Sequence, residues 1–180
     1  MSSILKVDQL QDSGGNNLVT SNGSGVITAA GFGKIGQVLT TGRSSSDSDQ
    51  TITAASYTDM TNMSLSITPT STSSKVLILA YFQVRVFRQA VNSGGGARIV
   101  RDSTTIFEPK ADGTGPYQWY VQFGGTTSEY NLHGPTHMSF LDSPATTSAT
   151  TYKLQGRVYN SSSNPEFRIE GQSSLTLMEV

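Results

Sequence analysis

One stretch of the chain, residues 74–87 with the sequence SKVLILAYFQVRVF, constrains the fold more than any other. Its apolar residues recur with the period of two that is typical of a β-strand. The even-numbered positions of the stretch are all apolar, namely Val76, Ile78, Ala80, Phe82, Val84 and Val86. The pattern predicts a long strand that crosses the middle of a sheet and buries this face in the core.

The opposite face of the same strand is also apolar over its first half. Leu77, Leu79 and Tyr81 precede the polar residues Gln83 and Arg85. A half-buried strand needs only one apolar face, so this second face requires a cover of its own. We therefore expect Leu77, Leu79 and Tyr81 to lie at a subunit interface or against a second sheet.

The composition of the chain favours an all-β fold. Ser and Thr make up roughly a quarter of the 180 residues, 18 residues are Gly, and only 14% are charged, against ~25% in an average soluble domain. No segment has the period of an amphipathic helix. After residue 50 the strand signals recur at intervals of about ten residues, as in a sandwich or barrel. We predict a jelly-roll-like β-sandwich over residues 51–180.

Three segments of this domain carry specific expectations. The alternation of aromatic and polar residues over residues 117–123 predicts a strand whose aromatic face fills the core, with a row that stacks sugars as the alternative. Residues 92–96, NSGGG, predict a flexible loop. The Gly-Pro pair between the only two histidines, His133 and His137, predicts a turn, which does not provide the helical i, i+4 geometry of a metal pair.

Residues 1–42 differ from the rest because their short apolar groups are separated by Gly, Ser and Asn. Such a segment cannot form a core alone, so we expect an extended arm that is either disordered or ordered against partners. Residues 43–50, RSSSDSDQ, have no apolar anchor and predict a linker. The arm residues expected to dock are Ile4, Leu5, Val7, Leu10, Leu18, Val19, Val26, Ile27, Phe32, Val38 and Leu39.

A G-x-G-x-x-G sequence occupies residues 31–36 of this arm. In the dinucleotide fingerprint a strand precedes these glycines and a helix follows them directly. The residues that follow here, QVLTTGRSSSDSD, cannot sustain a helix, and we predict no nucleotide site.

The composition also argues against several function classes. A net charge of −1 argues against a nucleic-acid partner, and the absence of Cys removes disulfides and thiolate metal sites. The first ten residues resemble neither a signal peptide nor a membrane span. No nucleophile elbow is present, and the histidines have no acidic neighbour in sequence. We expect no catalytic residue, no metal, no cofactor and no enzymatic activity.

The basic residues are concentrated between residues 75 and 110, which predicts one basic strip on the surface. Its candidate docking residues are Arg85, Arg88, Arg98 and Arg101. The strip is either a solvated sheet face or a docking patch for an acidic partner.

Several phrases of the sequence together resemble a known family. They are MSSILKVDQLQDSGGNN, GFGKIGQVLTT, TPTSTSSKVLI, RIVRDSTTI, FLDSPATTSATTYKLQ and SSLTLMEV. They resemble virion structural proteins of marine bacteriophages, often described as tail fibres or fibre-like. The body also resembles tumour-necrosis-factor-like jelly rolls, which form tight trimers around a symmetry axis.

The resemblance implies a homotrimer in the virion, with an arm that docks to other virion proteins and a sandwich that is displayed. A tail fibre and a capsid decoration or head-fibre protein would differ only in what the arm binds. The remaining alternative is an adhesin that binds a host glycan through its outer loops. Exposed aromatic and acidic residues around residues 92–96, 109–116 and 124–135 would favour that alternative.

Overall fold

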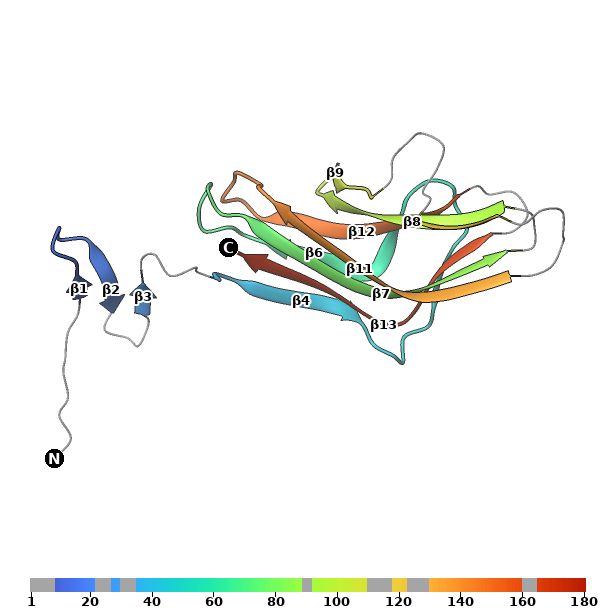
Figure 1. The fold of residues 1–180 in the computed structure, drawn as a ribbon, viewed down its shortest axis with the longest axis horizontal. Helices are drawn as coiled ribbons and strands as arrows, with labels where there is room; N and C mark the ends of the chain where they lie inside the picture. Colours follow the sequence, from blue (N-terminus) through green and yellow to red (C-terminus); the bar gives the residue numbers. More distant parts are fainter. Residues whose placement is uncertain are drawn as a thin grey trace, which may run out of the picture. The chain divides into compact units, whose positions relative to one another are not determined.

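The computed structural model describes residues 9–21, 27–29, 35–88, 92–109, 118–122, 130–159 and 165–180. The chain divides into two compact units, Met1–Ile35 and Gly36–Val180. Every regular element in the described ranges is a β-strand, which confirms the predicted all-β fold (Figure 1).

The strands of the first unit have three to five residues, and those of the second unit have between three and fourteen. They are β1 (Gln9–Gln11), β2 (Asn17–Ser21), β3 (Ile27–Ala29), β4 (Val38–Arg43), β5 (Gln50–Ile52), β6 (Thr58–Ile67), β7 (Val76–Arg88), β8 (Asn92–Arg101), β9 (Thr104–Phe107), β10 (Trp119–Gln122), β11 (Tyr130–Asp142), β12 (Thr150–Val158) and β13 (Glu166–Glu179).

The N-terminal unit contains a small antiparallel sheet with the order β1-β2-β3. The turn after β1 is held by Asp12, whose carboxylate accepts hydrogen bonds from the backbone N–H groups of Gly14 (2.8 Å) and Asn16 (2.9 Å). Hydrogen bonds from the side chain and backbone of Asn16 lower the pKa of Asp12. Gly15 takes a φ of 81°, a conformation that favours glycine.

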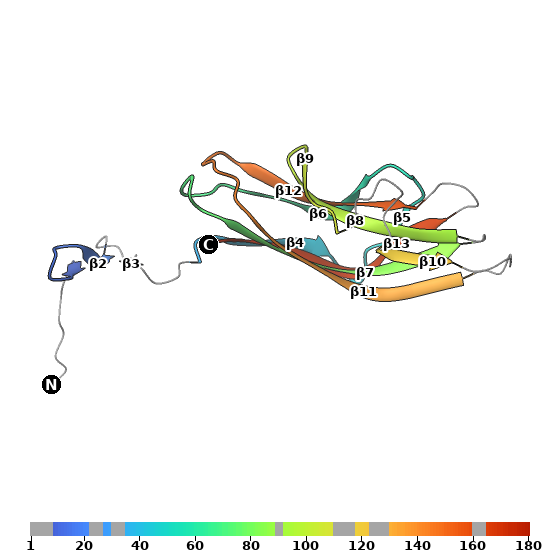
Figure 2. The same cartoon turned by 45° about the horizontal axis from the view of Figure 1, so that its top comes forward.

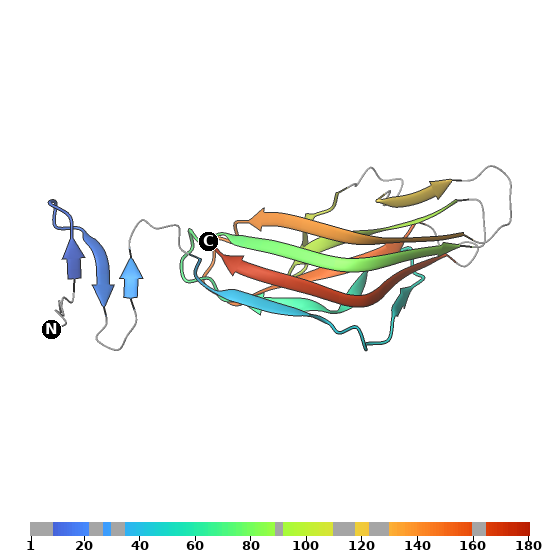
Figure 3. The same ribbon diagram turned by 60° about the horizontal axis from the view of Figure 1, so that its bottom comes forward.

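The second unit is a sandwich of two antiparallel sheets (Figure 2). One sheet, here called the β7 sheet, has the order β11-β7-β13-β4, and β5 also pairs with β13. The other, the β8 sheet, has the order β10-β8-β12-β6, and β9 also pairs with β8. The strands of the β7 sheet lie side by side in Figure 3. The predicted β-sandwich is confirmed.

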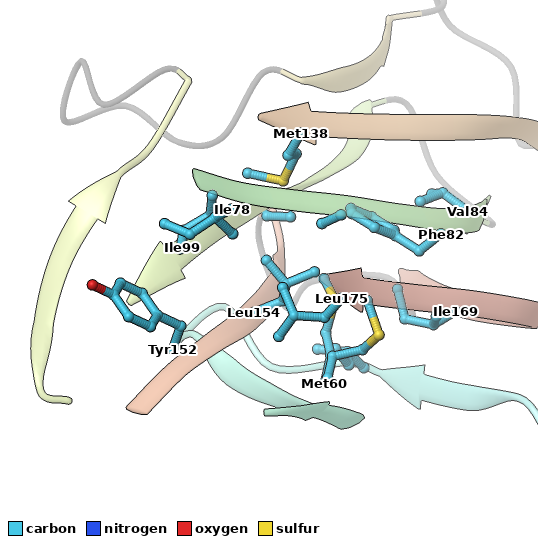
Figure 4. Packing of buried hydrophobic residues seen from close by; sticks show 14 of the residues in the cluster. Met60, Ile78, Phe82, Val84, Ile99, Met138, Tyr152, Leu154, Ile169 and Leu175 are labelled. Atoms are coloured by element: carbon cyan, nitrogen blue, oxygen red, sulfur yellow. The ribbon is translucent and has the colours of Figure 1, made fainter. Parts of the chain in front are cut away.

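The core lies between the two sheets. All the even-numbered residues from Val76 to Val86 are buried, as their alternation predicted. Ile78 and Phe82 of β7 lie between the sheets with Ile99 of β8 and Leu154 of β12 (Figure 4). Because these side chains come from both sheets, a single apolar layer holds the sandwich closed.

Trp119 on β10 supports the core interpretation of the aromatic row. Its ring centroid lies 6.2 Å from that of Phe82 and 5.3 Å from that of Phe167. Tyr117 and Phe123, the other aromatic residues at alternate positions of the row, lie outside the described residues.

The prediction of a loop at residues 92–96 is wrong, because these residues begin β8. A Cβ atom on Gly95 would lie 2.3 Å from Cδ2 of Phe167, and one on Gly156 would lie 2.8 Å from Cε1 of the same ring. The glycines of β8 and β12 thus make room for a buried phenylalanine.

The predicted turn at Gly134-Pro135 is also wrong, because both residues lie inside β11, which pairs with β7 without interruption. β11 is an end strand of the described β7 sheet. Proline is tolerated in an edge strand because its missing N–H can face away from the neighbouring strand.

The boundary between arm and sandwich lies earlier than the sequence predicted. Residues 38–43 form β4 and pair with the C-terminal strand β13, so Val38 and Leu39 belong to the sandwich. Residues 43–50 do not link two units, since they connect β4 to β5, which both pair with β13. Arg43 is buried and donates a hydrogen bond to the backbone carbonyl of Ser48, which fixes this connection.

Two buried carboxylates tie distant parts of the sandwich together. Asp142 on β11 accepts hydrogen bonds from Tyr152 Oη (2.6 Å) and from Arg101 Nη1 (2.9 and 3.0 Å), which joins the two sheets at one end. Burial and the bond to Asp142 raise the pKa of the Tyr152 hydroxyl. These bonds give the buried Asp142 carboxylate the hydrogen-bond partners that a buried polar group requires.

The second carboxylate, Glu179, is only 3% exposed. Burial by itself would raise its pKa, but hydrogen bonds from Thr70, Ser74 and Gln37 outweigh that effect and lower the pKa to about 2. Because Gly36 N–H also donates to the Glu179 carbonyl (2.8 Å), the start of the sandwich is held against its end.

Two N-terminal deletions should separate the arm from the sandwich. Removal of residues 1–35 should leave the free energy of unfolding of the sandwich unchanged within about 0.5 kcal/mol. Removal of residues 1–42 takes away most of β4, whose ladder with β13 has six residue pairs. At about 0.5–1.5 kcal/mol per hydrogen bond this should lower stability by roughly 3 kcal/mol or more. Urea denaturation of both variants measures the difference, and equal stability would place the boundary after β4.

The close approach of β8 to Phe167 gives a second prediction. Gly95→Ala should lower the free energy of unfolding by about 1–3 kcal/mol, because the added methyl group overlaps the ring. Gly134→Ala is the matched control, since nothing lies within 4 Å of its Cβ position. Thermal and urea denaturation should show a loss only for Gly95→Ala; a loss of similar size in both variants would contradict the steric explanation.

Candidate interaction face

The outer face of the β7 sheet, which points away from the β8 sheet, carries an unusual set of apolar residues. Register places Leu141, Leu77, Met178 and Val38 in one row across β11, β7, β13 and β4. The next rows add Leu79 and Tyr81 on β7. We call these residues the apolar patch: Val38, Leu77, Leu79, Tyr81, Leu141 and Met178.

Four members of the apolar patch are among the large apolar side chains that remain exposed. The exposed fractions are 56% for Val38, 47% for Leu141, 40% for Leu79 and 36% for Tyr81. The two most exposed of these, Val38 and Leu141, lie on the end strands β4 and β11, so the patch reaches both edges of the described sheet. A contiguous exposed apolar surface of this kind marks an interaction site.

An open hollow of about 420 Å³ lies at one side of the patch. Leu79 and Tyr81 of β7 line it together with His137 of β11. The imidazole of His137 meets the Tyr81 ring edge-on, with centroids 5.1 Å apart and an interplanar angle of 78°. The remaining lining residues are Ala80, Met138, Ser139, Ser174 and Thr176.

The other end of the same face is charged, but its charges are paired within the subunit. Glu170 on β13 lies 3.0 Å from Nδ1 of His133 and 3.8 Å from Nη1 of Arg85. Arg85 also donates a hydrogen bond to Asn131 (2.7 Å). A further pair joins Arg168 to Glu166 at 2.6 Å. The arginines and glutamates of this end therefore balance one another.

The predicted basic strip does not form a single surface. Arg85 lies on the β7 sheet and Arg98 on the β8 sheet, whereas Arg101 is engaged with Asp142 between the sheets. Arg88 ends β7, and its side chain is outside the described residues. Closeness in sequence did not produce closeness in space, because β7 and β8 belong to different sheets.

Arg98 instead takes part in a stacked cluster on the outer face of the β8 sheet. Its guanidinium carbon lies 3.9 Å from the centroid of the Tyr57 ring, and that of Arg157 lies 5.1 Å away. The Tyr57 hydroxyl donates a 2.6 Å hydrogen bond to Glu108. Burial and this bond raise the pKa of Tyr57. The charged side chains of this cluster therefore contact the Tyr57 side chain within the same subunit.

The predicted docking residues of the arm are only partly described. Leu10 lies on β1, Leu18 and Val19 on β2, and Ile27 on β3. Leu10 and Leu18 are exposed. Ile4, Leu5, Val7, Val26 and Phe32 lie outside the described residues.

Within the described ranges, no group of three or more His, Asp or Glu side chains is arranged to hold a metal ion. The same ranges contain no helix that is long and apolar enough to cross a membrane. The residues that follow the G-x-G-x-x-G sequence form the strand β4 in place of the helix that a dinucleotide site requires.

Sequence reasoning identified Leu77, Leu79 and Tyr81 but missed the rest of the face. Leu141, Met178 and Val38 join them through pairing between strands, which no local pattern reveals. The contact of His133 with Glu170 was missed for the same reason, since 37 residues separate them.

Comparisons with known proteins leave the family open. No protein-family model and no curated protein sequence matches the chain. A chain from a solved structure of infectious bursal disease virus, Gx strain, is similar with a TM-score of 0.39 and 11% identity. The match covers 86% of this chain and 36% of that one, so this chain spans about a third of the viral chain's length. Similarity at this level assigns neither family nor function.

Proposed function

We propose that the protein is a non-enzymatic structural component of a bacteriophage virion, a tail fibre or fibre-like appendage, that self-associates through the outer face of the β7 sheet. The observation that carries this proposal is the apolar patch. The inner face of the β7 sheet already closes the core, so the patch is surplus to the folding of one subunit. Its cover must come from another molecule.

A second copy of the chain is the occupant that this face fits best. Its arginines and glutamates are paired within the subunit, so the face offers little attraction to a strongly charged partner. The apolar row also ends in exposed side chains at both edges, Leu141 on β11 and Val38 on β4. The β11 edge of one copy can therefore meet the β4 edge of the next, as a closed ring of three requires.

The N-terminal unit is the proposed docking element, and the sandwich is the displayed one. The strands β1 to β3 contain no Asp, Glu, Lys or Arg, so attachment would rest on packing and strand addition. The virion assignment itself rests on the resemblance of the sequence to phage structural proteins. A capsid decoration protein would use the same parts on a different particle surface.

Self-association has a direct test. The chain should be a trimer by light scattering at micromolar concentration, and Leu79→Asp should raise the dissociation constant at least about a hundredfold, because it would bury an unpaired charge. Ser64→Asp is the matched control, since Ser64 is exposed on the β8 sheet opposite Lys153. A monomeric wild type, or equal effects of both variants, would refute the proposed interface.

Docking can be tested with a phage that carries the protein. Removal of residues 1–35 should abolish incorporation into particles while the sandwich still folds and self-associates. Attachment of the intact protein should change little between about 0.05 and 0.5 M salt, because few charges take part. Gold labelling of the intact protein would then distinguish a tail location from a capsid one. Normal incorporation of the truncated protein would show that the arm is not the anchor.

A further inference from the structure

The two histidines of the chain lie on one strand and one face, but in different surroundings. His133 is placed beside Glu170, with Nδ1 3.0 Å from the carboxylate. His137 lies four residues further along β11, beside the apolar patch. It lines the hollow with Tyr81. Among the described residues, a carboxylate contacts His133, whereas none forms an ion pair with His137.

The groups that face His137 are neutral on each strand packed beside it. On β7 its register partner is Tyr81, followed by Leu79 and Gln83. Across the hollow, β13 presents the hydroxyl groups of Ser174 and Thr176. The first charged group along the described face is Glu170 on β13, which lies opposite Gln83 in the next row and contacts His133 with its carboxylate. The others lie further along it: Arg85 on β7, Glu166 and Arg168 on β13, and His133 on β11.

We propose that His137 makes self-association through the outer face of the β7 sheet dependent on pH. The neutral imidazole is compatible with a covered hollow, because its ring packs on Tyr81 and serine and threonine hydroxyls can satisfy its nitrogens. The imidazolium is not, because association would remove an unpaired charge from water. This inference rests on the interface proposed above.

Histidine is the side chain that ordinarily changes charge between pH 5 and 8. The buried carboxylate Glu179 stays ionised over this range, because its pKa is about 2. Asp59 also stays ionised: burial would raise its pKa, but hydrogen bonds from Gln155 and Lys153 outweigh this and lower it. The fold should therefore persist at pH 5.5 while the interface responds.

The experiment is sedimentation velocity of the full chain from pH 8 to pH 5.5, at fixed ionic strength and in the presence of a chelator. The association constant should fall at least about tenfold on acidification. Its logarithm should change with pH with a slope that approaches about three for three histidines per trimer. Circular dichroism at each pH reports whether the subunit remains folded.

Three variants test whether His137 is the residue that makes association depend on pH. His137→Gln and His137→Thr should remain associated at pH 5.5 and lose the slope, whereas His133→Gln should retain it. A slope that survives in the His137 variants, or their failure to associate at pH 8, would overturn the assignment. Equal association of the wild type at pH 8 and 5.5 would overturn the pH dependence alone. A wild type that is monomeric at both pH values would instead overturn the proposed interface.

Discussion

The sandwich depends on the pairing of its C-terminal strand. β13 lies between β7 and β4 in one sheet and pairs with β5 as well, so it joins the first strands of the unit to β7. Its inner face contributes Phe167, Ile169, Leu175 and Leu177 to the core. Without this strand, β4 and β5 would have no partner in the β7 sheet.

Polar groups at one end of the sandwich are organised around two carboxylates, since Asp142 and Glu179 both lie in register with Val76. Asp142 draws Arg101 and Tyr152 from the β8 sheet to an edge strand of the β7 sheet. Glu179 gathers donors from the segment before β7 and from the residue before β4. Each carboxylate would be costly to bury alone and is stabilising only because several donors converge on it. Directional hydrogen bonds therefore close this end of the sandwich, where the apolar core stops.

The two faces of β7 differ in role: the inner face packs in the core, and the outer face carries the proposed interface. The inner face is buried from Val76 to Val86, whereas the outer face changes from an apolar end to a charged end whose arginines and glutamates pair with one another. A solvated sheet face normally carries polar residues at such positions. The apolar end is the part of the surface on which self-association is proposed.

The alternation of side chains by itself determined which residues of β7 face the core, because the period of two is a local property of an extended chain. It also showed that the first half of β7 has a second apolar face. Only the tertiary structure decided that residues 92–96 and the Gly-Pro pair of β11 lie within strands, since the space for Phe167 and the position of an edge depend on distant segments. The same holds for β4 and for the row from Leu141 to Val38, because backbone hydrogen bonds between strands leave no signature in the residues that make them.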